Sequence, residues 1–130
     1  MTQPLQHVRH GFGCVRPYVH GHLAMWDMVK DAFGAVELER QEFGPNSFHI
    51  EAQIGDSMIV LETGDPPSSE GVPGSIYVYV PDVDASYRQA LDRGAVSIAA
   101  PEEKPYQERA AGVRDTFGNV WWISTYLGLN

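Results

Sequence analysis

The chain has 130 residues, of which 43% are hydrophobic and 20% are charged, and its formal net charge at pH 7 is −8. This composition is ordinary for a soluble globular domain, and the acidic charge without any basic cluster argues against nucleic acid as a partner. The apolar runs are only as long as strands, so we predict that no segment spans a membrane. The residues that follow Met1 lack the apolar stretch of a signal peptide, so we predict none. The single cysteine, Cys14, excludes an internal disulfide and favours a cytoplasmic protein, and we expect its side chain to be buried.

The first half of the chain predicts a short strand, a helix and three further strands. Pro17 has no backbone N–H group, so the first strand should lie at a sheet edge. Gly34 is placed to end the helix, and Gly55-Asp56 between two apolar runs indicates a tight hairpin. The expected elements are a strand at 14–19, a helix at about 22–33, and strands at 36–42, 48–54 and 57–62.

A segment rich in glycine, proline and serine, 63–74, separates this half from a second half with the same pattern. Asp82 is typical of a helix N-cap. The expected elements of the second half are a strand at 75–80, a helix ending at Arg93, and strands at 96–99, about 109–114 and 120–126. We therefore place a first module at 1–66, a linker at 67–74 and a second module at 75–130.

Two short repeats support this duplication. The tripeptide Gly-Ala-Val occurs at 34–36 and again at 94–96, each time after a predicted helix and before a predicted strand. The hairpin signal at Gly55-Asp56 likewise has a counterpart at Gly118-Asn119. Self-similarity of this kind indicates two copies of one supersecondary unit, here strand, helix and three strands.

Four segments together resemble the vicinal oxygen chelate superfamily, which includes glyoxalase I, extradiol dioxygenases and the fosfomycin-resistance and bleomycin-resistance proteins. They are DAFGA at 31–35, HIEAQIGDS at 49–57, YVPDVDA at 79–85 and VRDTFGNVW at 113–121. The resemblance covers the chain from about Val15 to Tyr126. It is specific for the fold and does not specify a reaction.

The resemblance implies an α+β fold in which two βαβββ modules form curved mixed sheets around a cavity. It also implies a homodimer, in which each module pairs with a module of the other chain and completes the cavity. In the enzymes of the superfamily this cavity holds a divalent metal, bound by His, Glu or Gln side chains from the first and last strands of the modules. The metal acts as a Lewis acid on a substrate with two adjacent oxygens.

The corresponding positions in this chain are poor in metal ligands. They fall at Arg16 (or Cys14), on the strand that ends at Glu62, at Ser75 and at Trp122. A divalent cation needs three or four O, N or S donors that converge on one point, and this set cannot supply them. We therefore predict no metal, no other cofactor and no catalytic residue.

The strands offer aromatic surface instead. By the geometry of the superfamily, alternate residues of the first and last strands of each module face the cavity, where flat rings with polar ends suit a planar ligand that stacks. Arg16 and Ser75 could orient the oxygens of such a ligand. The predicted ligand-binding residues are Arg16, Tyr18, Met58, Val60, Ser75, Tyr77, Tyr79, Trp122 and Ser124. The tryptophans and tyrosines could equally fill the core of a small barrel.

Two functions of different class follow. The first is a non-catalytic protein of the bleomycin-resistance type, which sequesters an aromatic antibiotic or natural product. The alternative is a metal-dependent lyase, isomerase or ring-opening enzyme of the glyoxalase or dioxygenase type. A displaced metal site would draw on His20, His22, His49, Glu51 or Glu62, and three of these, His20, His49 and Glu51, could also act in acid–base catalysis. A metabolite sensor or a subunit of a larger assembly is a third class that the sequence does not discriminate.

Overall fold

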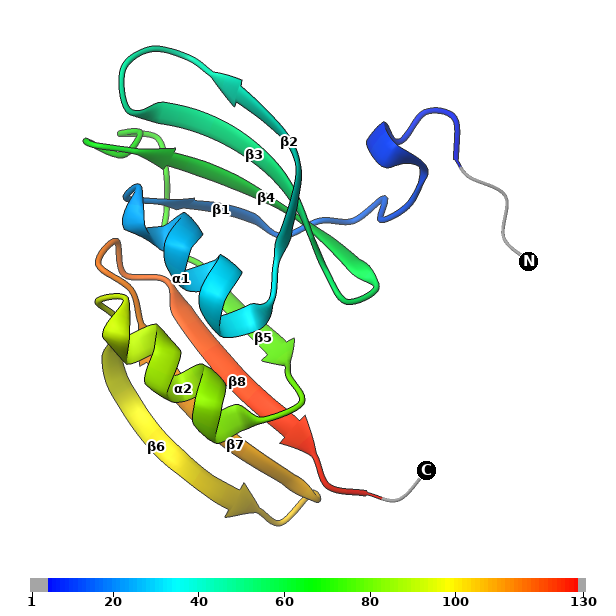
Figure 1. Ribbon diagram of the computed structural model, residues 1–130, viewed down its shortest axis with the longest axis vertical. Helices are drawn as coiled ribbons and strands as arrows, with labels where there is room; N and C mark the ends of the chain where they lie inside the picture. Colours follow the sequence, from blue (N-terminus) through cyan, green and yellow to red (C-terminus); the bar gives the residue numbers. More distant parts are fainter. Residues whose placement is uncertain (1–4, 129–130) are drawn as a thin grey trace.

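The computed structural model describes residues 5–128 and contains two four-stranded sheets, each covered on one face by a helix (Figure 1). The elements follow the order β-α-β-β-β twice, which confirms the predicted α+β fold of two similar modules. The first module contains β1 (Tyr18–Gly21), α1 (Ala24–Phe33), β2 (Val36–Glu42), β3 (Ser47–Ile54) and β4 (Ser57–Gly64), preceded by a short 3₁₀ helix, η1 (Arg9–Gly11). The second contains β5 (Ser75–Tyr79), α2 (Val83–Asp92), β6 (Val96–Lys104), β7 (Glu108–Arg114) and β8 (Val120–Tyr126). The module boundaries at 66, 67–74 and 75 stay a prediction.

Both sheets are mixed and open. Their strand orders are β1-β4-β3-β2 and β5-β8-β7-β6, and in each sheet the first strand runs parallel to the last while the other pairs are antiparallel. β1 and β5 are each hydrogen-bonded on one side only, and they form the neighbouring edges of the two sheets (Figure 1). No helix in the range 5–128 combines the length and the apolar character needed to cross a membrane.

Three details differ from the sequence predictions. The first strand begins at Tyr18 rather than at Cys14, because Pro17 cannot donate to a neighbouring strand and contributes only its carbonyl, which accepts from the Val60 N–H at 2.9 Å. β6 extends to Lys104 through Pro101, since an edge strand can leave this position unpaired. Its register to β7 shifts between Ser97 and Ala99 and again between Ala99 and Glu102, the stretch that contains the proline. The side chain of Cys14 is exposed, so the expectation of burial was wrong.

The two helices begin and end where local chemistry requires. The side chain of Asp82 accepts from the Ala85 N–H at 3.2 Å and caps α2, as predicted. Gly34 ends α1 in the left-handed conformation at φ 71°, which a residue without a Cβ adopts at little cost. These caps fix which turn of each helix meets its sheet.

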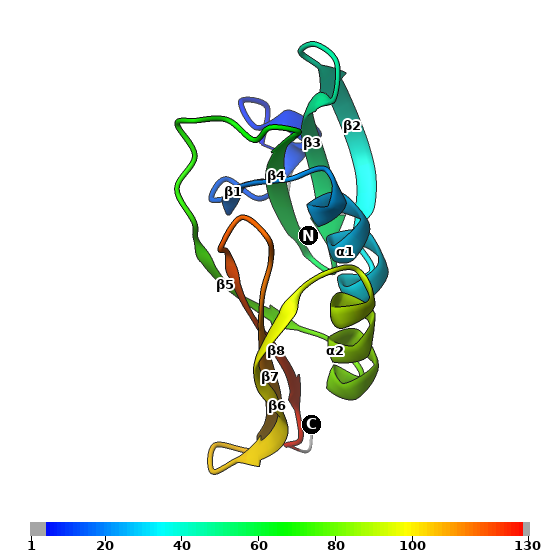
Figure 2. The ribbon, with the colours of Figure 1, turned by 90° about the vertical axis from the view of Figure 1, so that its left-hand side faces the viewer.

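One hydrophobic core runs through both modules. The helices α1 and α2 pack side by side on the same side of the two sheets (Figure 2). Trp121 on β8 is fully buried, and its ring centroid lies 5.3 Å from that of Phe33 on α1. The largest fully buried side chains come from both halves of the chain: Trp121, Met28, Ile50, Met58, Leu61 and Ile123. The two modules therefore do not have separate cores.

Asp115 organises the turn between β7 and β8. One of its carboxylate oxygens accepts from the backbone N–H groups of Phe117, Gly118 and Asn119 at 3.0–3.1 Å. The other accepts from the side-chain amide of Asn119 at 2.9 Å and from the indole N–H of Trp121 at 3.0 Å. This single carboxylate thus fixes both the turn and the orientation of the largest core side chain.

Asn119 extends this network to the other module. Its side-chain amide donates to the His20 carbonyl on β1 at 2.7 Å, and its side-chain oxygen accepts from the Gly74 N–H at 2.8 Å. Asn119 is completely buried, so a partner lost here could not be replaced by bulk water. The amide joins the turn between β7 and β8 of the second sheet to the first strand of the first sheet.

We predict that Asn119→Ala lowers the free energy of unfolding by about 3 kcal/mol, because it removes three hydrogen bonds made by a fully buried side chain, to His20, Gly74 and Asp115. The measurement is urea unfolding followed by circular dichroism. The control is Gln89→Ala, which truncates an exposed amide on α2 and should change stability by less than about 0.5 kcal/mol. Equal stability of the two variants would show that the network does not couple the modules.

Candidate functional site

Each sheet has a second face, opposite its helix, on which polar and aromatic side chains gather. On the second sheet Val78, Ala111 and Ile123 point to the core, so the alternate residues of the same strands point the other way. The register places Trp122 of β8 between Tyr77 of β5 and Gly112 of β7. We call the side opposite the helices the open face of each sheet (Figure 2).

The open face of the second sheet contains a cavity of about 300 Å³, which we call the aromatic cavity. Its lining residues are Tyr77, Ala99, Lys104, Tyr106, Ala110, Ala111 and Trp122. Three rings and the aliphatic stem of a lysine therefore surround a floor of small residues. Such a concave site, mostly apolar with a few polar groups, is typical of small-molecule binding sites.

The six-membered ring of Trp122 lies close against Gly112. A Cβ added at Gly112 would lie 2.5 Å from the six-membered ring of the indole, closer than any real contact, so only glycine permits this position of the ring. Ala110, two residues earlier on β7, is also small and lines the cavity. The indole is 36% exposed, which leaves one of its surfaces available to a ligand.

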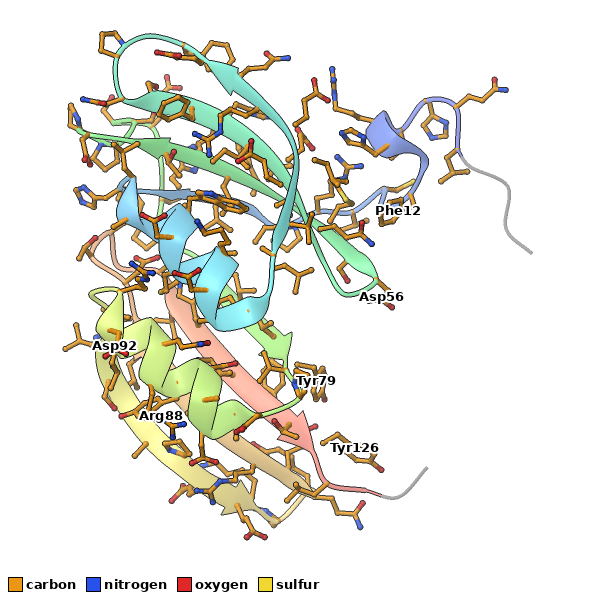
Figure 3. The ribbon with its side chains drawn as sticks, in the orientation of Figure 1. Phe12, Asp56, Tyr79, Arg88, Asp92 and Tyr126 are labelled. Carbon is orange, nitrogen blue, oxygen red and sulfur yellow. The ribbon has the colours of Figure 1, made fainter. Side chains whose placement is uncertain are left out.

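A buried carboxylate lies beside this cavity. Glu108 on β7 is 7% exposed and accepts hydrogen bonds from the hydroxyls of Ser124 at 2.7 Å, Tyr79 at 2.6 Å and Tyr77. These hydrogen bonds, first that of Ser124, lower the pKa of Glu108. The bond to Glu108 raises the pKa of Tyr79 to about 12, and burial together with the same carboxylate raises the pKa of Tyr77. Tyr79 projects from the end of β5 (Figure 3).

The open face of the first sheet carries charges instead of rings. His49 contacts two carboxylates, Glu51 at 2.7 Å through Nε2 and Glu62 through Nδ1. Arg16 donates to the other oxygen of Glu51 at 2.7 Å, and the Tyr18 hydroxyl donates to Glu62 at 3.2 Å. We call these five residues the His49 cluster. Because both ring nitrogens of His49 meet carboxylates, the arrangement favours the imidazolium, which donates from both.

The N-terminal segment closes over this cluster. Besides its bond to Glu51, the guanidinium of Arg16 donates to the carbonyls of Gly13 at 2.8 Å and Phe12 at 2.9 Å. Arg9 in η1 forms an ion pair with Glu39 on β2 at 2.7 Å. Only a small cavity of about 130 Å³ remains beside His49 and Glu51.

The structure distributes the predicted ligand-binding residues over three sites and leaves Ser75 apart from them. Tyr77 and Trp122 line the aromatic cavity, and Tyr79 and Ser124 join it through Glu108, while Ser75 is exposed at the start of β5. Arg16 and Tyr18 belong to the His49 cluster, and Val60 pairs with Tyr18 across β1 and β4. Met58, together with Tyr77 and Tyr79, lines a larger cavity of about 610 Å³ where the two sheets meet. We call this third site the junction cavity.

Sequence reasoning missed Tyr106, Glu108 and Gly112. Glu108 and Gly112 lie on one face of β7 with Ala110, and this alternation of an acid with two very small residues was a usable signal for a floor beneath large side chains. Tyr106 gave no signal, because it belongs to the turn between β6 and β7, and only the folded turn brings its ring to the cavity.

The residues present do not fit the metal implied by the resemblance. Arg16 and Glu62 lie on the first module and are engaged in the His49 cluster, whereas Ser75 and Trp122 lie on the second sheet. Across residues 5–128, no three side chains of His, Cys, Asp or Glu form a group that could hold a metal ion.

The five candidate ligands of a displaced metal site do not all meet at one point. His49, Glu51 and Glu62 do meet, but both ring nitrogens of His49 face carboxylate oxygens, so neither nitrogen faces a position between the carboxylates where a cation could sit. His20 stacks beside Tyr18 with 4.8 Å between the ring centroids, and His22 contacts Asp65 at 3.3 Å.

The pH dependence of stability tests the His49 cluster. Burial, the largest single influence, lowers the pKa of His49, but the hydrogen bonds and charges of Glu62 and Glu51 together raise it above its ordinary value of 6.5. A histidine whose pKa is raised on folding stabilises the folded state most below its unfolded pKa, and this contribution is lost as the pH rises through the folded pKa. His49→Gln should therefore destabilise the protein more at about pH 6 than at about pH 9 in urea unfolding.

His7→Gln, which changes an exposed histidine outside the cluster, serves as the control and should show no such difference. A His49→Gln effect that is the same at both pH values would mean that the imidazole is neutral in the folded protein.

Comparison with known proteins gives both sequence and structural relatives. No protein-family model matches the chain. An uncharacterised protein of Mycobacterium bovis is 31% identical over 125 residues, which cover 82% of this chain and 82% of that protein. An uncharacterised protein of Mycobacterium tuberculosis H37Rv is also 31% identical, and the match covers 82% of this chain and 73% of that protein.

Among solved structures, TioX from Micromonospora sp. ML1 has a TM-score of 0.65 at 21% identity, and the match covers 87% of this chain and 99% of the TioX chain. A glyoxalase/bleomycin resistance protein/dioxygenase family enzyme from Burkholderia phytofirmans PsJN has a TM-score of 0.62 at 23% identity, with coverages of 87% and 96%. TnmS3, an antibiotic binding protein from Streptomyces sp. CB03234, has a TM-score of 0.60 at 20% identity, with coverages of 84% and 91%. The chain therefore belongs to one family with these mycobacterial proteins, and it has the fold of solved glyoxalase/bleomycin resistance protein/dioxygenase structures.

Proposed function

We propose that this protein binds a planar aromatic small molecule, an antibiotic or natural product, in the aromatic cavity and sequesters it without chemical change. The observation that carries the proposal is the indole of Trp122, which lies on Gly112 with a surface exposed toward a cavity of about 300 Å³. A flat ring fixed on a glycine backbone forms a rigid stacking surface. Little side-chain entropy is lost when a ligand stacks on a ring that is already held in place.

The other rings of the cavity suit the same ligand. Tyr77 and Tyr106 line it with Trp122, and aromatic pairs gain about 0.5–1.5 kcal/mol beyond the burial of their area. Ala110 and Gly112 keep the floor low, so that a ring can approach the sheet. The name of one structural neighbour, an antibiotic binding protein of Streptomyces, agrees with this type of function.

The proposal predicts how two substitutions affect the binding of acridine, a neutral planar molecule at neutral pH. Trp122→Ala removes the stacking surface, and Gly112→Ala pushes the indole into the cavity, so each should weaken binding about ten-fold or more in isothermal titration calorimetry. Phe43→Ala, which removes an exposed ring from the loop after β2, should leave the affinity unchanged. The thermal unfolding midpoint of each variant checks that it is folded.

Two results would contradict this function. Unchanged acridine affinity in Trp122→Ala would exclude the proposed stacking surface. Stoichiometric divalent metal in the purified protein, whose removal by a chelator abolishes turnover of a substrate, would favour the alternative, a metal-dependent enzyme of the glyoxalase or dioxygenase type.

We further propose that the chain forms a homodimer through the edge strands of its two sheets. β1 and β5 each have one edge without a strand partner in the described part of the chain, and an unpaired edge is a ready site for another strand. The junction cavity lies beside these edges and is lined by apolar side chains, including Val15, which is 93% exposed. A second copy seated there would cover this surface and bring residues of both chains to one cavity.

The dimer predicts a subunit number of two in native mass spectrometry at micromolar concentration. Val15→Asp places a charge on the proposed interface and should shift the protein to the monomer. Val72→Asp introduces the same charge at another exposed valine, in the linker, and should leave the dimer intact. A monomeric parent protein would refute the proposal.

A further inference from the structure

We propose that the ligand of the aromatic cavity carries a positive charge, an ammonium or amidinium group on the planar ring system, and that Glu108 attracts it. This inference rests on the proposed function, because it concerns the same cavity. It specifies the chemistry of the ligand, which neither the fold nor the similar proteins determine.

The first argument is the charge state of Glu108. Its carboxylate is more than nine-tenths buried, and its three hydrogen-bond donors, Ser124, Tyr77 and Tyr79, are all neutral hydroxyls. Hydroxyl donors stabilise the ionised carboxylate but do not cancel its charge. Its pKa is accordingly lowered, so the group is a carboxylate at neutral pH. Within residues 5–128, Glu108 forms no salt bridge.

The second argument is that the neighbouring cations have other partners. Lys104 lies opposite Glu108 in the β6–β7 register, but its Nζ contacts Glu102 at 2.6 Å. Arg109, the next residue on β7, forms two hydrogen bonds with Asp84 at the start of α2, on the other face of the sheet. Neither Lys104 nor Arg109 therefore forms an ion pair with the Glu108 carboxylate.

The third argument is position. Glu108 does not itself line the aromatic cavity, but its hydrogen-bond partner Tyr77, its cross-strand neighbour Lys104 and its same-face neighbour Ala110 all do. A phenol that donates its proton to a carboxylate becomes a better hydrogen-bond acceptor, because neighbouring hydrogen bonds polarise one another. The Tyr77 oxygen is therefore suited to accept from an ammonium group on the ligand.

The rings favour the same charge. A cation over the face of a tryptophan or tyrosine is attracted by the ring quadrupole, and tryptophan is the best of these rings. Trp122 and Tyr77 are partners across β8 and β5, and both rings line the cavity. An anionic ligand would meet the Glu108 carboxylate and the net charge of −8, both of which repel it.

The competing explanation is that Glu108 is purely structural and holds the three hydroxyls together. Both explanations predict that Glu108→Gln disturbs the open face of the sheet. Only the binding explanation predicts that the substitution acts on charged ligands and spares neutral ones of the same shape. The test therefore compares ligands that differ in charge and share one ring system.

The experiment measures the affinities of 9-aminoacridine, acridine and acridine-9-carboxylate, which are cationic, neutral and anionic at neutral pH, by isothermal titration calorimetry. The parent protein should bind 9-aminoacridine most tightly and acridine-9-carboxylate most weakly. Glu108→Gln should lower the affinity for 9-aminoacridine about ten-fold, leave that for acridine within about two-fold, and raise that for acridine-9-carboxylate. The control is Glu103→Gln, which removes the same charge from an exposed residue of β6 whose cross-strand partner is Arg109, and it should preserve the order of the three affinities.

The outcomes separate the two proposals. If acridine binds in a Trp122-dependent way but the three affinities are equal, or if Glu108→Gln lowers all three alike, the charge inference is wrong and the proposed function stands. If none of the three compounds binds, the proposed aromatic site itself is wrong, and the inference falls with it. If Glu108→Gln does not fold, Tyr77→Phe, which removes the hydroxyl beside Glu108, takes its place. The inference then requires that the parent protein prefers the cationic compound and that Tyr77→Phe loses this preference.

Discussion

The architecture depends on one buried carboxylate and the amide beside it. Asp115 fixes the β7–β8 turn and the indole of Trp121, and Asn119 carries the network from this turn to the His20 carbonyl on β1. A duplicated chain could place its two sheets in many relative positions, since each sheet needs only one helix to cover its apolar face. Directional hydrogen bonds among buried groups select one of these positions, because every other arrangement would leave polar groups without partners.

This constraint also determines where ligands can reach. With α1 and α2 packed side by side, both helices cover the same side of the molecule, and the open faces of both sheets lie on the other side (Figure 2). The two open faces then differ through their side chains alone. The His49 cluster and the N-terminal segment leave a cavity of about 130 Å³ on the first, whereas Tyr77, Tyr106 and Trp122 line a cavity of about 300 Å³ on the second. One duplicated scaffold thus carries a charged face with a small cavity and an aromatic face with a larger one.

Local patterns predicted most of the fold. The hairpin signal at Gly55-Asp56, the N-cap at Asp82 and the glycine at Gly34 each act within a few residues, and the structure contains the corresponding elements. The first strand was misplaced, because Pro17 blocks donation but does not show where pairing resumes. The pairing of Tyr77 and Trp122 on one face also followed from strand alternation combined with the resemblance to a known fold. Whether these rings bind a ligand stays a prediction.

The sequence alone determined the duplicated βαβββ order and the aromatic character of the second module's strands, because periodicity and turn chemistry are properties of neighbouring residues. Only the tertiary structure decided that Trp121 fills the core while Trp122 lies exposed on Gly112, and that Glu108 meets three hydroxyls from two other strands. The partners of Glu108 are separated from it by 16 to 31 residues. Contacts over such distances depend on sheet register and packing, and no local pattern in the chain encodes them.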